Sequence, residues 1–137
     1  MVYWEYNLGI TERNMEIKEY TEFKADEILQ LYTQVGWTAY TEDMPALERG
    51  YKNSLLVLAA YENGELLGIV RVVGDGTTIV LVQDILVYPA RQRQGIGTAL
   101  LKAVLRQPFR PAAGERSTGR AHRDEEYELH FRHLPCH

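Results

Sequence analysis

The sequence predicts an α/β protein built on one mixed sheet, and three patterns lead to this prediction. Strand-length runs of β-branched and aliphatic residues alternate with helix-length segments whose apolar residues recur three and four apart. These segments follow one another in the order β-α-α-β-β-β-α. Glycine-containing turns join the three consecutive strands, which is typical of an antiparallel meander. The chain of 137 residues suits a single domain.

The N-terminal elements are predicted as follows. Residues 1–14 have no clear period, so they form either an N-terminal extension or an extra edge strand. The first well-patterned strand covers residues 16–20. A helix is predicted from Ala25 to Val35, and Gly36 ends it. Its apolar residues share one face: Ile28, Leu29, Leu31, Tyr32 and Val35.

An aromatic-rich loop is expected at residues 36–40, between two helices. The second helix runs from Met44 to about Lys52. Asp43 is a suitable N-cap for it, because a carboxylate accepts hydrogen bonds from the first free N–H groups. Pro45 in the first turn is compatible with a helix start.

The meander is predicted from three strongly hydrophobic strands at residues 55–61, 66–73 and 77–88. The Asn63-Gly64 step favours a type I′ hairpin turn between the first two strands. Residues 74–76, Gly-Asp-Gly, turn the chain again. Strands of this hydrophobicity are expected to be covered on both faces.

The third strand leads into a short basic loop and a helix that opens on glycines. Pro89 ends the strand, since it cannot donate a hydrogen bond to a sheet. The free N–H groups of a helix start favour an anion such as a pyrophosphate, and Arg91 and Arg93 add positive charge. The spacing alone is also compatible with a tight turn and a solvated loop. The apolar face of the helix consists of Ile96, Leu100, Leu101, Val104 and Leu105.

The pattern Gln92-x-x-Gly95-x-Gly97, after Val87-Tyr-Pro and before Thr98-Ala-Leu-Leu, resembles the acetyl-CoA-binding motif of the GNAT superfamily of N-acetyltransferases. The order of elements over residues 15–106 is also similar to that family. The resemblance implies an acyl-CoA N-acyltransferase-like fold. It further implies an enzyme that transfers an acetyl group from acetyl-CoA to the amine of a small-molecule acceptor by direct attack.

The resemblance also implies binding residues. In that family the loop amides hold the pyrophosphate of CoA, and the preceding strand binds the pantetheine arm. The implied acetyl-CoA contacts are Ile85, Leu86, Val87, Gln92, Arg93, Gln94, Gly95, Ile96, Gly97 and Thr98. The acceptor is expected near Trp37, Thr38 and Tyr40, where a core position is the competing interpretation for Trp37. Arg71 and Tyr88 are further candidates for the cleft.

Acetyl transfer to an amine needs a proton acceptor and a donor to the oxyanion. Backbone N–H groups near Leu86 suit the second task. Asp84 is the only carboxylate in its strand, and apolar neighbours would raise its pKa toward a useful value. The alternative is a structural Asp84 that accepts from backbone donors. Strand alternation places Gln83 on the opposite face. No residue matches the tyrosine that serves this family as general acid.

The segment 107–137 departs from the family. It contains all four histidines and Cys136, but no lysine and no strand-like run. It is expected to be disordered or loosely packed, with at most a short helix at 125–134, so one wall of the CoA cleft would be missing. A shifted reading frame would explain the change, and sequencing the coding DNA tests this: a frame without a family-like continuation would exclude it.

The departure supports a second hypothesis, a catalytically impaired chain that at most binds CoA or self-associates as a homodimer through an exposed strand edge. No metal is expected, because Pro135 interrupts the helical spacing of His130, His133 and His137. The net charge of −4 argues against a nucleic-acid partner. No apolar run reaches the roughly 18 residues of a membrane span, and no signal peptide is visible, so a cytoplasmic location is expected.

Overall fold

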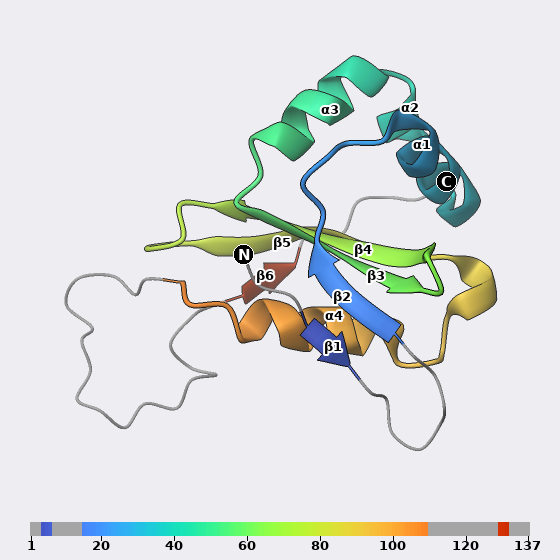
Figure 1. Ribbon diagram of the computed structural model, residues 1–137. Helices are drawn as coiled ribbons and strands as arrows, with labels where there is room; N and C mark the ends of the chain where they lie inside the picture. The colour runs from blue at the N-terminus through green and yellow to red at the C-terminus, as the bar shows by residue number, and fades with distance from the viewer. Residues whose placement is uncertain (1–3, 7–14, 110–128, 132–137) are drawn as a thin grey trace, which may run out of the picture.

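The computed structural model describes residues 4–6, 15–109 and 129–131, which form one six-stranded sheet with helices on both faces (Figure 1). The strands are β1 (Trp4–Tyr6), β2 (Met15–Glu19), β3 (Leu56–Glu62), β4 (Glu65–Gly74), β5 (Val80–Val87) and β6 (Leu129–Phe131). The helices are α1 (Ala25–Val35), α2 (Thr38–Thr41), α3 (Met44–Lys52), the 3₁₀ turn η1 (Pro89–Arg91) and α4 (Ile96–Leu105). The strands lie side by side in chain order, and only β5 and β6 are parallel.

The local signals in the sequence act as predicted. Gly36 ends α1 in the left-handed region, with φ of 92°. The Asp43 side chain caps α3 by accepting a 3.1 Å hydrogen bond from the Ala46 N–H. Asn63 and Gly64 have φ of 53° and 81°, which are the positive values that a type I′ turn requires.

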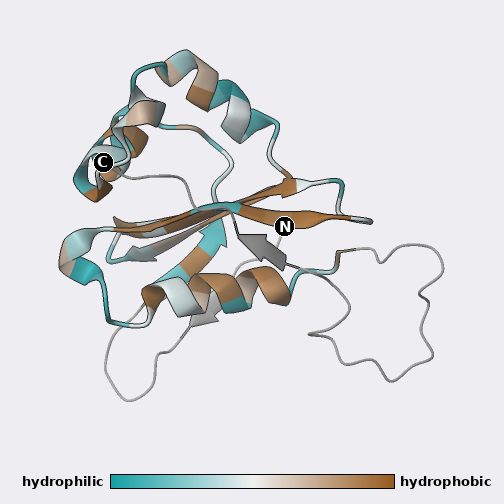
Figure 2. Cartoon of the chain, turned by 180° about the vertical axis from the view of Figure 1, so that it is seen from behind, coloured by the Kyte–Doolittle hydropathy of each residue, from teal (hydrophilic) through white to brown (hydrophobic). Residues whose placement is uncertain are grey.

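The sheet separates two apolar layers, so the prediction of strands covered on both faces is confirmed. Helices α1 and α3 lie on one face and α4 on the other, each with its apolar side turned inward (Figure 2). Buried side chains under α1 and α3 include Ile28, Leu31, Leu47, Ile69 and Leu86. Those under α4 include Leu58, Val70, Ile96, Leu100 and Val104.

Two apolar helix faces are narrower than predicted. Leu29 of α1 is 42% exposed and Leu105 of α4 is 40% exposed. Each follows a fully buried neighbour, Ile28 or Val104, and successive helix residues are rotated by about 100°. The rotation carries both leucines to the outer side.

A bulge in β5 determines which side chains face α1. The register pairs Val72 with Val82 and Arg71 with Asp84, so Gln83 is an extra residue without a partner in β4. An extra residue reverses the alternation of side chains beyond it. The prediction that Gln83 lies opposite Asp84 is therefore wrong.

The reversal is visible in the packing on both sides of the bulge. Before it, Val82 packs on the α4 side of the sheet, and after it Ile85 and Val87 do so. Leu86 packs on the α1 side, where Asp84 also meets side chains from α1 and α2.

The strand β5 begins later than predicted, at Val80 and not at Thr77. Asp75 explains the difference, because its Oδ1 accepts from the backbone N–H groups of Thr77, Thr78 and Ile79 at 2.8, 2.7 and 3.1 Å. These bonds, with the Thr78 hydroxyl, hold the pKa of Asp75 well below its usual value. The carboxylate thus closes a turn where the sequence predicts extended chain.

The predicted loop at 36–40 is partly helical, because α2 starts at Thr38. The ring of Tyr40 packs edge-on against Tyr32 of α1, with centroids 5.3 Å apart, and this contact fixes the segment against α1. Long-range packing of this kind is absent from local sequence patterns.

The two ends of the chain each add a strand. Residues 4–6 form the extra edge strand that the sequence left open as an alternative, paired with β2. The prediction of no strand beyond residue 107 is wrong at 129–131, where β6 pairs with Val80–Val82, and the helix expected at 125–134 is likewise absent there. Residues 110–128 and the candidate metal ligands His133 and His137 lie outside the described part. None of the described helices has the length and apolar content to cross a bilayer.

Candidate active site

A groove lies where β5 meets the start of α4, on the α4 face of the sheet. Its volume is about 360 Å³, and it is lined by Ile85, Val87, Arg91, Gln92, Arg93, Gly95, Ile96, Gly97 and Thr98. Gly95 is the N-cap of α4, with φ of 86°, and no side chain caps the helix. The first N–H groups of a helix have no intrahelical partner, and because no side chain caps them in α4, an anion such as a pyrophosphate fits them.

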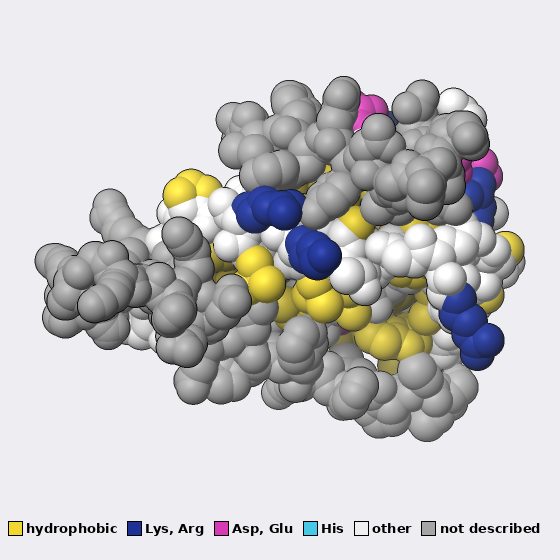
Figure 3. Space-filling model, turned by 90° about the horizontal axis from the view of Figure 1, so that it is seen from below, with side chains coloured by type: hydrophobic (Ala, Val, Ile, Leu, Met, Phe, Trp, Pro, Cys, Tyr) yellow, Lys and Arg dark blue, Asp and Glu magenta, His cyan; other side chains and the backbone are white. Residues whose placement is uncertain are grey.

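The two arginines of the loop have different surroundings. Arg91 pairs with Glu62 of the β3–β4 hairpin, with Nη1 and Oε1 2.8 Å apart, so it ties the loop to the sheet. Arg93 is exposed and forms no ion pair with a described residue. Lys and Arg side chains are spread over this face, and the acidic side chains in view lie near its margin (Figure 3). Arg93 is thus the loop cation best placed to meet an anion.

The strand β5 has one edge that no described strand occupies beyond Val82, since β6 ends there. The Tyr88 N–H donates to the Leu67 carbonyl at 3.0 Å, so by ladder alternation the peptide groups of Ile85 and Val87 point to the opposite edge. The Gln92 side chain accordingly donates to the Val87 carbonyl at 3.0 Å. Leu86, also expected to contact acetyl-CoA, has a fully buried side chain and directs its peptide groups toward β4.

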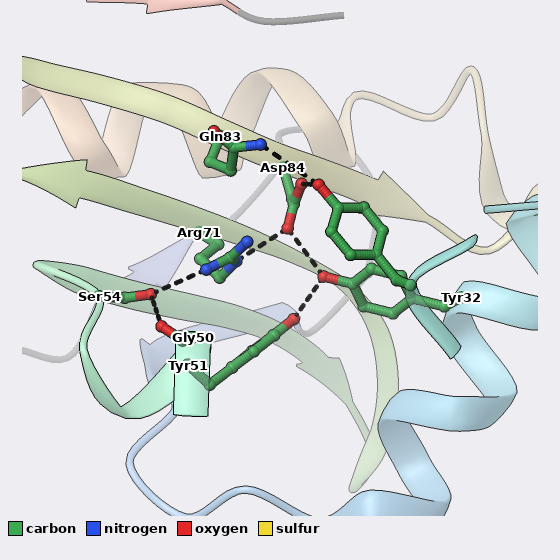
Figure 4. A network of polar contacts seen from close by, with 8 residues as sticks. Tyr32, Gly50, Tyr51, Ser54, Arg71, Gln83 and Asp84 are labelled. Atoms are coloured by element: carbon green, nitrogen blue, oxygen red, sulfur yellow. Dashed lines mark hydrogen bonds and ion pairs between the residues drawn. The ribbon is translucent and has the colours of Figure 1, made fainter. Parts of the chain in front are cut away.

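Asp84 lies at the centre of a buried polar network on the α1 face (Figure 4). Its side chain is completely buried. Oδ2 accepts from Nε of Arg71 at 2.8 Å and from the Tyr32 hydroxyl at 2.9 Å. Oδ1 accepts from the Tyr40 hydroxyl at 3.1 Å. The carboxylate is therefore ion-paired and bonded on both oxygens.

Further hydrogen bonds and ring contacts surround the ion pair of Arg71 and Asp84. The hydroxyls of Tyr32 and Tyr51 are 2.9 Å apart, and Tyr51 is the donor because the Tyr32 proton is directed at Asp84. Arg71 lies over the Tyr51 ring at 5.3 Å, and its Nη1 donates to the Ser54 hydroxyl at 3.3 Å. Burial raises the pKa of Tyr32 well above its usual value, so this phenol stays protonated as a donor.

These surroundings differ from the apolar environment that the sequence predicts for Asp84. Burial alone would lower the pKa of Arg71, but the Asp84 carboxylate outweighs this effect and raises it. The Arg71 guanidinium is thus held in its charged form, and the Asp84 carboxylate is bonded to it and to the two phenols of Tyr32 and Tyr40. The donors are side chains, whereas the alternative interpretation expects backbone groups.

The three residues expected on the acceptor side lie in and beside α2, with unequal contacts. The rings of Trp37 and Tyr40 are stacked, with centroids 6.1 Å apart. Trp37 is half-buried among the α1-side aromatics, which fits the competing core interpretation. Thr38 is exposed, and its carbonyl accepts from the Thr41 hydroxyl. Tyr40 alone of the three bonds to β5, where its oxygen also accepts from Gln83 at 3.2 Å.

Local sequence reasoning misses Tyr32, Tyr51 and Gln83 as parts of the network. The two tyrosines occupy buried helix positions, where an aromatic residue indicates a core contact. The available signal is the polar tip of each ring, since a buried phenol usually needs a hydrogen-bond partner. The hydrogen bond from Gln83 to Tyr40 depends on the bulge in β5, and no local sequence pattern indicates that bulge.

A second cavity of about 480 Å³ lies on the α1 face, between that helix and the end of β5. It is lined by Glu27, Gln30, Gln34, Gly64, Glu65, Leu66, Leu67, Tyr88, Ala90 and Arg91. The carboxylates and amides offer hydrogen-bond acceptors. Within residues 4–6, 15–109 and 129–131 no three His, Cys, Asp or Glu side chains come together as metal ligands.

Comparison with known proteins identifies the family and the fold. The model of the acetyltransferase (GNAT) family matches residues 22–128. A GNAT-family acetyltransferase from Streptococcus pneumoniae is 32% identical in sequence to this protein. The match covers 88% of this chain and 76% of the Streptococcus pneumoniae chain, with a TM-score of 0.65. A probable acetyltransferase from Staphylococcus aureus is 19% identical, with coverages of 88% and 80% and a TM-score of 0.67, and so shares the fold.

A third structure, a GNAT-family acetyltransferase from Brucella melitensis in complex with acetyl-CoA, is 25% identical, covers 69% of this chain and 68% of its own, and has a TM-score of 0.52. Comparison with curated proteins gives no significant match. The family match covers well over half of the chain and includes the groove at α4. We conclude that this protein belongs to the GNAT family of acetyltransferases.

Proposed function

We propose that this protein transfers an acetyl group from acetyl-CoA to the amine of a small-molecule acceptor. One observation carries the proposal: the uncapped start of α4 opens onto the same groove as the edge of β5 that no described strand occupies beyond Val82. The first feature suits a pyrophosphate, and the second can bind an extended amide-containing arm as an added strand. The Brucella melitensis relative was solved with acetyl-CoA, which supports the choice of cosubstrate.

The reaction is direct. The nitrogen lone pair of a neutral amine attacks the thioester carbonyl carbon, so a C–N bond forms and the C–S bond breaks. The nitrogen loses one proton and the sulfur gains one. The N–H groups of Ile85 and Val87 point to the edge of β5 that no described strand occupies, where they are suited to bind the developing oxyanion.

We further propose that Asp84 supports this reaction through its neighbours. Its side chain is fully buried and ion-paired with Arg71, so a free amine has no direct access to it. The carboxylate instead fixes Tyr40 and the β5 bulge beside the transfer edge, which is the edge of β5 at Ile85 and Val87 where we place acetyl transfer. The proton that the amine loses then passes to water.

The cavity on the α1 face supports a small acceptor with an ammonium group. Its volume of about 480 Å³ is in the range of small-molecule pockets. Glu27 and Glu65 contribute negative charge, and Arg91, the cation of the lining, pairs with Glu62 at 2.8 Å and more loosely with Glu65 at 3.9 Å. Tyr88 links the cavity to the end of β5. A substrate that binds as an ammonium ion and loses a proton before acetyl transfer suits this lining.

Calorimetric titration of the purified chain with acetyl-CoA tests the proposal. We expect one-to-one binding with a dissociation constant in the micromolar range, which is about −8 kcal/mol at 1 μM. A folded chain that does not bind acetyl-CoA would contradict the proposal. Binding without transfer to any amine would favour the second hypothesis, a chain that holds CoA but does not catalyse.

Replacing Arg93 with glycine is expected to separate stability from binding. Arg93 has φ of 67°, a left-handed conformation that costs a non-glycine residue about 1 kcal/mol, so Arg93→Gly raises the free energy of unfolding by roughly that amount. Loss of the exposed charge weakens acetyl-CoA binding about two- to fivefold. Urea unfolding and calorimetry measure the two effects.

The matched control is Arg93→Ala, which removes the charge and keeps the unfavourable backbone conformation. It should weaken acetyl-CoA binding to the same extent without the gain in stability. Equal affinities for all three chains would show that Arg93 does not face the pyrophosphate.

A further inference from the structure

Tyr40 carries the ring contacts and the hydrogen bonds that join helix α2 to α1 and to the sheet. None of the four α2 residues is buried. The Tyr40 ring packs edge-on against Tyr32 and stacks on Trp37, and its hydroxyl bonds to Asp84 and Gln83 of β5. In the described part of the chain, this hydroxyl is the hydrogen-bonded link between α2 and the sheet.

The link depends on the bulge in β5. Successive residues of a regular strand point to opposite faces, so a regular β5 would direct only one of Gln83 and Asp84 toward α2. The bulge brings both within reach of one hydroxyl, which accepts from Gln83 at 3.2 Å and donates to Asp84 at 3.1 Å. The Tyr40 hydroxyl can therefore form both hydrogen bonds only when β5 contains the bulge.

Tyr40 also covers the carboxylate. The other two donors to Asp84 are more deeply buried, since Tyr32 is 0% and Arg71 is 7% exposed, whereas Tyr40 is only half-buried. Burial, followed by the nearby Asp84 charge, raises the pKa of Tyr40, so its phenol keeps its proton near neutral pH. An acceptor that approaches from α2 meets this phenol before it meets Asp84.

We propose that Tyr40 is a positioning residue, whose hydroxyl fixes α2 on the β5 bulge and so sets the acceptor side of the transfer site. The inference rests on the proposed function, because it takes the edge of β5 as the place of acetyl transfer. It adds a residue that shapes acceptor binding without holding acetyl-CoA, since the acetyl-CoA groove lies on the opposite face of the sheet.

The test compares Tyr40→Phe with Tyr61→Phe. The first change removes only the hydroxyl and keeps the ring contacts. The control removes the hydroxyl of another half-buried tyrosine, for which no hydrogen bond to a described residue exists. Because a bond to a charged group is lost, amide hydrogen exchange over residues 38–43 should accelerate about tenfold in Tyr40→Phe, with α1 and α3 unchanged. Tyr61→Phe should exchange as the unaltered chain does.

Kinetics provide a readout that a purely structural role would not change. Release of the CoA thiol is followed with a panel of aliphatic mono- and diamines. Tyr40→Phe should raise KM for the best amine about fivefold and leave KM for acetyl-CoA within about twofold of the original, in line with one lost hydrogen bond. Unchanged exchange over residues 38–43, or faster exchange with an unchanged acceptor KM, would overturn the inference. Failure of the proposed function would appear separately, as absent acetyl-CoA binding by the unaltered chain.

Discussion

Replacing Asp84 with alanine is expected to lower the free energy of unfolding by about 3–5 kcal/mol, as breaking a buried ion pair usually does. The change leaves the Arg71 guanidinium, 7% exposed, without its counter-charge. It also removes the acceptor of the Tyr32 and Tyr40 hydroxyls. Urea unfolding followed by circular dichroism measures the loss.

Two comparisons make the Asp84 result specific. Glu48→Ala breaks an exposed pair with Lys52 at 3.5 Å and should cost at most about 0.5 kcal/mol. The double change Arg71→Met with Asp84→Leu removes both charges together, and it should recover most of the stability lost in Asp84→Ala. A loss below about 1 kcal/mol in Asp84→Ala would mean that Arg71 finds another partner, and the central role given to Asp84 would be wrong.

Replacing Gly68 with alanine is expected to affect stability and acetyl-CoA binding together. A Cβ at this position would lie 2.6 Å from the Leu86 carbonyl oxygen and 3.2 Å from the Val87 Cα. Both are backbone atoms, so β4 and β5 have to separate where they are paired. We expect a loss of about 1–3 kcal/mol in the free energy of unfolding. Acetyl-CoA binding should weaken about tenfold, because a displacement of Val87 moves the transfer edge.

Gly97→Ala is the stability control for Gly68→Ala. Its added Cβ would make ordinary contacts of 3.9 Å with Ile85 and Val87, and alanine favours a helix over glycine by up to about 1 kcal/mol. The free energy of unfolding of Gly97→Ala should therefore equal or exceed that of the original chain. If the free energy of unfolding of Gly68→Ala lies within about 0.5 kcal/mol of that of the original chain, β4 and β5 accommodate the added Cβ without cost, and the prediction is wrong.

The groove at the start of α4 could be predicted from the sequence because its geometry is local. The anion site that we propose consists of successive backbone groups between Gln92 and Thr98, and one strand-to-helix turn places them all. The strands of the meander and helices α1, α3 and α4 were predictable for a similar reason, since apolar periodicity follows directly from helix and strand geometry. These features need no knowledge of which segments meet.

The surroundings of Asp84 could not be predicted in this way. Its partners Arg71, Tyr40 and Tyr32 are 13, 44 and 52 residues away in the chain. The bulge that turns it toward them is a property of the pairing between β4 and β5. The sequence therefore indicates the position of a buried carboxylate, whereas the identity of its partners depends on contacts that form only in the folded protein.

The order of the strands has a consequence for biosynthesis. Strands β1 to β6 lie side by side in the order of the chain, so each new strand finds its neighbour already made. A nascent chain can thus extend the sheet strand by strand as it leaves the ribosome, in antiparallel pairs up to β5. The parallel partner β6 needs a longer connection and joins last, which leaves the edge of β5 open during synthesis. A ligand that binds this edge would therefore stabilise the partly formed sheet before β6 joins it.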